Sequence, residues 1–142
     1  MKNTIVKEMV LSHSIESVWN AISNGSLISE WFLSADFKAE KGYKYTFHSP
    51  KEDCEPIIGE VKEADPYTLR YTWEVKGTNV ETLVSWVLTK TDNGTHLFLE
   101  HSGIENYADS AMIKEMYESF NGGWDNCLQG LQQFLKDTVH AG

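Results

Sequence analysis

The hydrophobic period of the sequence changes at about residue 34, and this change constrains the fold more than any other feature. From there to residue 102, apolar residues recur at every second position, and turn-forming residues interrupt them at the spacing of an antiparallel meander. Strands are predicted near residues 35–39, 43–48, 57–63, 68–75, 81–90 and 96–102. The segment 81–102 is predicted to be a hairpin, because Asn93 and Gly94 both tolerate the positive φ of a two-residue turn.

Alternation along these strands predicts which side chains share a face of the sheet. One face is mostly polar, whereas the other carries Leu69, Tyr71, Trp73, Val84, Trp86, Leu88, Leu97, Leu99 and His101. An apolar face needs a second layer to cover it. The predicted cover is a helix from about residue 113 to 138, whose apolar stripe is Phe120, Trp124, Cys127, Leu128, Leu131, Phe134 and Leu135.

The segment before the meander predicts one strand and two short helices. Residues 4–11 are the strand, and Ser14 can cap a helix with the apolar stripe Ile15, Val18, Trp19 and Ile22. Gly25 is expected to end that helix. A second helix begins at about Ser26, with Leu27, Ile28, Trp31 and Phe32 on its buried side. The whole pattern predicts a single α+β domain over residues 1–142.

Charge and hydropathy exclude several classes of partner. The chain has 21 acidic and 12 basic residues, a net charge of −9, so phosphate backbones would repel it and no nucleic acid is expected to bind. No apolar run is long enough for a membrane span. Lys7 and Glu8 interrupt the region where a secretory signal would be apolar, so a cytoplasmic location is expected.

The sequence contains no recognisable catalytic or metal-binding motif. Cys54 and Cys127 are expected to be separate thiols rather than a disulfide. The histidines at positions 13, 48, 96, 101 and 140 lack metal-ligand spacing, and no nucleophile elbow, phosphate loop or dinucleotide fingerprint occurs. Glu52, Asp53 and Glu55 are interpreted as a solvated loop. No catalytic residue, metal or cofactor is assigned.

Four segments together resemble a known family. They are "HSIESVWNAISNGSLISEWF" at 13–32, "GEVKEADPYTLRYTW" at 59–73, "HSG" at 101–103 and "GGWDNCLQGLQQFL" at 122–135. They resemble the START-like (SRPBCC) proteins of the heat-shock-chaperone ATPase activator homologue family. The resemblance implies a helix-grip fold, in which a curved antiparallel sheet wraps around the long C-terminal helix and leaves a cavity between them, open at one end.

The sheet face, the helix stripe and the implied cavity together predict a set of lining residues. They are Trp31, Tyr71, Trp73, Trp86, His101, Trp124, Cys127, Leu128 and Leu131. Trp73, Trp86 and Trp124 are predicted to contact a ligand, because indole rings combine a large apolar area with one donor. His101 has two interpretations, a group that orients a ligand or a core histidine bonded to protein partners. Cys127 is interpreted as a buried filler rather than a nucleophile.

Gly122 and Gly123 stand in a helical pattern where glycine costs about 1 kcal/mol per residue relative to alanine. One interpretation places them at the helix entrance and near the cavity mouth, where they leave room for a ligand or let the helix pivot. In the other, Asn121 begins or kinks the helix and the glycines permit tight packing on the sheet.

Three functions are compatible with these observations. The first is a binding protein that encloses an apolar or aromatic small molecule, such as a lipid, a flavonoid-like compound or a polyketide. The second, implied by the family, is a regulatory domain that interacts with a chaperone in the stress response, although we expect no separate N-terminal region of the kind that chaperone activators carry. The third is a cyclase-like or hydrolase-like enzyme, for which His101 is the one clear inward group.

Overall fold

The computed structural model describes residues 4–49 and 55–141, with side chains through Asp137. Along the chain the elements are β1 (Ile5–Leu11), α1 (Ile15–Ser23), α2 (Gly25–Trp31), β2 (Ser34–Asp36), β3 (Lys44–His48), β4 (Ile57–Asp65), β5 (Thr68–Val75), β6 (Thr82–Thr91), β7 (Gly94–Ser102), the short 3₁₀ helix η1 (Ile104–Asn106) and α3 (Ser110–Ala141). The predicted order of elements is confirmed, although β2 is shorter than expected.

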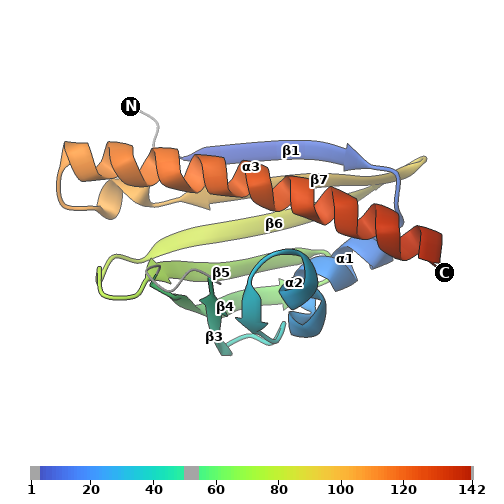
Figure 1. Cartoon of the computed structure of the whole chain (residues 1–142), viewed down its shortest axis with the longest axis horizontal. Coiled ribbons are helices and arrows are strands. Elements are labelled where there is room, and N and C mark those ends of the chain that lie inside the picture. Colours follow the sequence, from blue (N-terminus) through green and yellow to red (C-terminus); the bar gives the residue numbers. More distant parts are fainter. Residues whose placement is uncertain (1–3, 50–54, 142) are drawn as a thin grey trace.

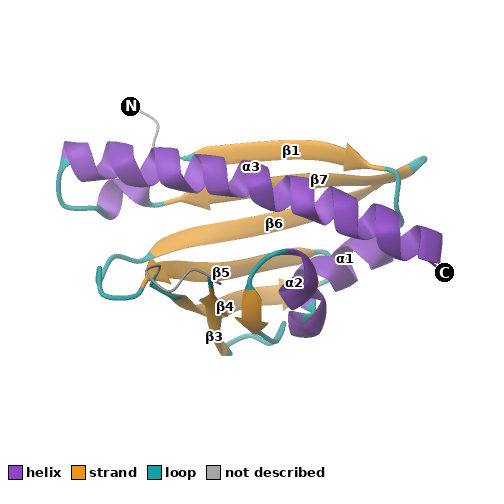
Figure 2. Ribbon diagram, in the orientation of Figure 1, coloured by secondary structure: helices purple, strands orange, loops and turns teal. Residues whose placement is uncertain are grey.

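The strands form one antiparallel sheet in the order β1-β7-β6-β5-β4-β3-β2. Helix α3 runs along one face of this sheet. Helices α1 and α2 lie together near the C-terminal end of α3 (Figures 1 and 2). This is the helix-grip arrangement that the family resemblance implied.

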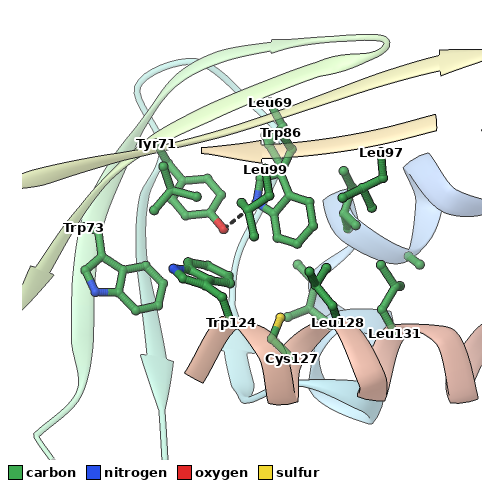
Figure 3. Close-up of a cluster of buried hydrophobic side chains, with 14 of the residues drawn as sticks. Leu69, Tyr71, Trp73, Trp86, Leu97, Leu99, Trp124, Cys127, Leu128 and Leu131 are labelled. Atoms are coloured by element: carbon green, nitrogen blue, oxygen red, sulfur yellow. Dashed lines mark hydrogen bonds between the residues drawn. The ribbon is translucent and has the colours of Figure 1, made fainter. Parts of the chain in front are cut away.

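The core lies between the sheet and α3, on the face that alternation predicted. The strand residues named in that prediction are all buried, and Leu69, Leu99 and Leu131 are fully enclosed. On α3 the apolar stripe faces the sheet, while Asp125 and Gln129 are exposed. Figure 3 shows the two sets of side chains meeting, with Leu128 and Leu131 of α3 reaching toward the strands. Burial of this stripe, worth about 25 cal/mol per Å² of apolar surface, stabilises the two layers against each other.

The boundary between α1 and α2 falls at Asn24, one residue before the expected position. The Asn24 side-chain oxygen accepts hydrogen bonds from the backbone N–H groups of Ser26, at 2.9 Å, and Leu27, at 3.3 Å. Gly25 therefore begins α2 instead of ending α1. Its lack of a side chain has a different reason, because a Cβ there would stand 2.5 Å from the Phe37 carbonyl oxygen.

The β6–β7 hairpin is confirmed, but its turn is displaced by one residue. Thr91 pairs with Gly94, so the central residues are Asp92 and Asn93, and Gly94 is the first residue of β7. None of these three residues has a positive φ. Gly94 is required by a close approach, because a Cβ would stand 1.9 Å from the Leu11 carbonyl oxygen. The predicted positive-φ turn at Asn93-Gly94 is therefore wrong.

Helix α3 begins at Ser110, a few residues before the prediction, and is continuous through the glycine pair. Asp109 caps it, because its side-chain oxygen accepts from the Met112 backbone N–H at 2.8 Å. Gly122 and Gly123 consequently lie in the middle of the helix. The interpretations that place the pair at the helix entrance, or begin the helix at Asn121, are wrong.

Candidate ligand pocket

A pocket of about 830 Å³ lies between the end of α2, the strands β3 to β5 and the N-terminal half of α3. The described residues that line it are Trp31, Phe32, Leu33, Phe47, Ser49, Glu55, Ile57, Trp73, Val75, Glu115, Met116, Ser119, Phe120, Gly123, Trp124, Asn126 and Cys127. Small-molecule sites in proteins have volumes of roughly 300–1,000 Å³ and mainly apolar, aromatic walls. The pocket fits that description.

Aromatic rings from the three regions meet at the pocket wall. Phe32, just after α2, stacks on Trp124 of α3 with ring centroids 5.9 Å apart, and its edge contacts Phe47 of β3 at 5.6 Å. Trp73 of β5 lies 5.2 Å from Trp124. In Figure 3 Trp73 and Trp124 stand together at one end of the buried cluster, away from Leu131. The wall therefore presents large, flat apolar surfaces.

Among the described residues of the wall, the charged groups are all acidic. Glu55 and Glu115 are the charged residues in the described lining, and both are exposed. The remaining polar lining residues are Ser49, Ser119 and Asn126. Glu55, which was interpreted as part of a solvated loop, is exposed and also reaches the pocket.

Three tryptophans line the pocket, and the indole N–H groups of two of them donate hydrogen bonds to acceptors within the protein. Trp31 Nε1 donates to the Ala21 carbonyl oxygen at 2.9 Å, which fastens the end of α2 to α1. Trp124 Nε1 donates to His101 Nδ1 at 2.9 Å. Trp73 Nε1 is buried and has no hydrogen-bond partner in the part of the chain that the structure describes. An unsatisfied buried donor costs about 1–3 kcal/mol.

His101 belongs to a hydrogen-bond relay in the core. Because its Nδ1 accepts from Trp124, its Nε2 carries the proton and donates to Thr82 Oγ1 at 2.7 Å, and Thr82 in turn donates to the Trp73 carbonyl oxygen at 3.0 Å. The ring stacks on Phe120 at 4.8 Å. Burial lowers the pKa of His101 from 6.5 to about 3, so the ring is neutral. Both ring nitrogens are occupied, which matches the interpretation of a core histidine with protein partners.

The predicted lining residues divide into two groups. Trp31, Trp73, Trp124 and Cys127 line the pocket, whereas Tyr71, Trp86, His101, Leu128 and Leu131 lie in the packed core beside it. Trp86 Nε1 donates to the Tyr71 hydroxyl at 2.9 Å, and the Trp86 ring packs edge-on against Trp124 (Figure 3). Contact of these core residues with a ligand stays a prediction that would require the core to open.

The sequence reasoning missed most of the remaining pocket wall. Met116 extends the stripe of Phe120 and Trp124 by one turn, so helical spacing was a signal for it. The alternating strand pattern could likewise have predicted Phe47 and Ile57, which also line the pocket. Phe32 is among the residues predicted on the buried side of the second helix, and it lines the pocket. For Leu33 and Glu115 no comparable signal exists, because they reach the pocket through the relative placement of α2 and α3.

The thiol of Cys127 is not activated. Burial raises its pKa well above the ordinary value, so it stays protonated at neutral pH, as expected of a buried filler. Cys54 lies outside the described residues. Within residues 4–49 and 55–141 no cluster of histidine, cysteine, aspartate and glutamate side chains could hold a metal ion.

The glycines of α3 have two different environments. At Gly122 and Gly123 nothing beyond the adjacent helix lies within 4 Å of the place where a Cβ would stand. Gly123 borders the pocket, and Gly122 does not. At Gly130, a Cβ would stand 2.8 Å from the Trp31 carbonyl oxygen. Close packing is therefore the role of Gly130 and not of the pair, and the tight-packing interpretation of Gly122 and Gly123 is wrong.

Comparison with known proteins places the chain in a family. A family model described as "Activator of Hsp90 ATPase homolog 1-like protein" matches residues 12–136. The chain belongs to this family. None of the helices that the structure describes is long and apolar enough to cross a membrane. No relative among curated proteins matches the chain.

Solved structures share the family fold. Protein MLL2253 from Mesorhizobium loti is 30% identical, with a TM-score of 0.83 over 95% of this chain and 98% of that chain. Protein BH1534 from Bacillus halodurans is also 30% identical, with a TM-score of 0.73 over 93% and 96%. DynU16, described as a protein in the dynemicin biosynthetic locus, is 18% identical with a TM-score of 0.80. The alignment with DynU16 covers 96% of this chain and 48% of that protein, and it shows the fold alone.

Proposed function

We propose that the protein is a cytoplasmic binding protein that encloses an apolar or aromatic small molecule in the pocket between the sheet, α2 and α3. The observation that carries the proposal is the pocket of about 830 Å³ with rings of Trp31, Phe32, Phe47, Trp73, Phe120 and Trp124 on its wall. Aromatic walls of this kind favour flat apolar ligands. The location of DynU16 in a biosynthetic locus supports a small molecule as the occupant.

The glycine at position 123 supports the same proposal. Glycine in a helix interior is unfavourable by about 1 kcal/mol, and no packing contact requires it here. Because Gly123 borders the pocket, its missing side chain enlarges the space beside Trp124. A ligand that approaches the helix backbone would benefit from that space.

The test is a ligand titration on matched valine variants. Native protein is titrated with flavone, other flavonoids and fatty acids while tryptophan emission is recorded, and a saturable change is expected. Gly123→Val should weaken binding about tenfold, or ~1.4 kcal/mol, at a nearly unchanged melting temperature. Gly122→Val is the control, because it changes the same helix without bordering the pocket. Trp124→Phe identifies the emitting ring.

Two results would contradict the proposal. If no compound in the panel binds the native protein, the pocket is not a site for this class of ligand. If Gly123→Val unfolds the protein while Gly122→Val does not, Gly123 is required for packing and its role at the pocket is lost.

The family description favours a second candidate, a domain that regulates a chaperone ATPase. An assay of chaperone ATPase rate with and without the protein tests it, and stimulation that survives Gly123→Val would indicate a surface separate from the pocket. An enzymatic role gains no support from His101, because both of its ring nitrogens are already bonded within the core.

A further inference from the structure

We infer that the pocket selects ligands that carry no negative charge and that present a hydrogen-bond acceptor to the indole N–H of Trp73. This inference rests on the proposed binding function and names the class of molecule within it. Two observations carry it independently, the unpaired donor on Trp73 and the sign of the charges at the pocket.

The first observation is the availability of donors on the wall. The indole N–H groups of Trp31 and Trp124 already donate hydrogen bonds within the protein, so neither is available to a ligand. Trp73 is 6% exposed and its Nε1 has no partner among the described residues. The nitrogen is covered in this conformation, and Trp73 lines the pocket, so a ligand oxygen can reach the N–H group only if the wall around the indole shifts. Formation of that bond removes the cost of an unsatisfied buried donor.

The second observation is that no positive charge compensates the acidic groups among the lining residues that the structure describes. Glu55 and Glu115 border the pocket, and no lysine or arginine occurs among its described lining residues. A carboxylate that entered would lose hydration against aromatic rings and approach two like charges. The net charge of −9 adds a long-range repulsion in the same direction.

Together these features indicate an uncharged aromatic compound with a carbonyl oxygen. The rings supply the apolar contact, and the Trp73 N–H supplies orientation. Fatty acids are disfavoured although their chains are apolar, because their carboxylate finds no cation among the described residues of the wall. The structure thus narrows the range of ligands from lipids and aromatic compounds in general to neutral aromatic compounds.

A matched set of three probes tests the donor and the charge separately. The probes are flavone, 2-phenyl-4H-chromene, which has a methylene in place of the carbonyl, and flavone-6-carboxylate. Calorimetry measures binding without relying on tryptophan emission. For native protein, loss of the carbonyl should weaken binding about tenfold, and the carboxylate should weaken it by at least about tenfold.

Variants assign these effects to residues. In Trp73→Phe, flavone and the methylene analogue should bind equally, because the donor is gone. Glu115→Gln should recover part of the affinity for the carboxylate, whereas Glu118→Gln should not, because Glu118 is exposed on the same helix and does not border the pocket. If Trp73→Phe is too unstable to measure, the comparison of flavone with its methylene analogue on native protein still decides the donor question.

The outcomes separate this inference from the proposed function. If flavone binds but the methylene analogue or the carboxylate binds equally well, the selection is wrong and the binding function stands. If a fatty acid binds tightly and flavone does not bind, the selection is likewise wrong and the binding function stands. If no probe or panel compound binds, the proposed function itself fails.

Discussion

At the scale of single residues, two glycines of α3 differ in whether a tertiary contact requires them. Gly130 allows α3 to approach the backbone of Trp31, whereas Gly122 is exposed and a Cβ there would meet no described atom beyond its own helix within 4 Å. Helix propensity favours alanine equally at both positions. The difference between the two substitutions therefore isolates the tertiary contact.

Gly122→Ala should raise the free energy of unfolding by about 0.5–1 kcal/mol, because alanine is the better helix former. Gly130→Ala should lower it, because the new methyl group meets the Trp31 carbonyl oxygen at 2.8 Å and a backbone must move. Urea unfolding of both variants measures the two signs. Equal stabilisation by both would show that α2 and α3 do not pack as described.

The buried His101 makes stability depend on pH in the acidic range. Its pKa is about 3 in the folded protein and 6.5 when exposed, so between these values the unfolded chain binds a proton that the folded chain does not. The contribution of His101 to the free energy of unfolding is fully present above pH 6.5. It decreases as the pH falls toward 3, by at most about 1.4 kcal/mol per pH unit.

His101→Gln should flatten this dependence, because glutamine does not titrate. Urea unfolding at several pH values between 7 and 4 compares the slopes of stability against pH. His96→Gln is the control at a surface histidine that pairs with Glu8. If the native protein and His101→Gln have the same slope, the ring is not held neutral in the core.

At the scale of elements, Asn24 separates two helices that would otherwise be one. Its backbone N–H bonds the Asn20 carbonyl oxygen at the end of α1, and its side chain caps α2. This junction directs α2 back toward the sheet and places Trp31 and Phe32 at the pocket. A single polar side chain thus links a helix boundary to the position of the pocket wall.

Asn24→Ala should lower the free energy of unfolding by about 1 kcal/mol, because two N–H groups of α2 lose their acceptor. It should also weaken ligand binding through the displaced end of α2. Asn20→Ala is the matched control, since Asn20 is exposed on α1 and its side chain caps nothing. An equal effect of the two substitutions on stability would contradict the capping role.

At the scale of the whole molecule, charge determines which partners can approach. Acidic residues exceed basic ones by 21 to 12, so the net charge repels a polyanion at long range. We expect no retention on a DNA column at physiological salt. Retention that weakens as salt rises would reveal a basic surface and overturn this expectation.

The sequence by itself determined the layers of the molecule. Alternation in the strands and the helical stripe of Phe120, Trp124, Leu128 and Leu131 each report the direction of side chains, which local backbone geometry sets. The core face and the order of elements followed from these patterns, whereas the family followed from the resemblance of four sequence segments. The turn at Asp92-Asn93 and the boundary at Asn24 were displaced by one residue, because glycine was interpreted as a turn signal where it permits a backbone contact.

Only the tertiary structure decided where the pocket lies and which indole N–H has no partner among the described residues. Alternation puts Trp73, Trp86 and His101 on one face, but it carries no information on which of them α3 packs against. The same limit applies to the indole N–H groups, whose partners come from distant parts of the chain, such as Ala21 for Trp31 and His101 for Trp124. Side-chain direction is a local property, whereas a cavity and an unpaired donor result from how two separately formed surfaces meet.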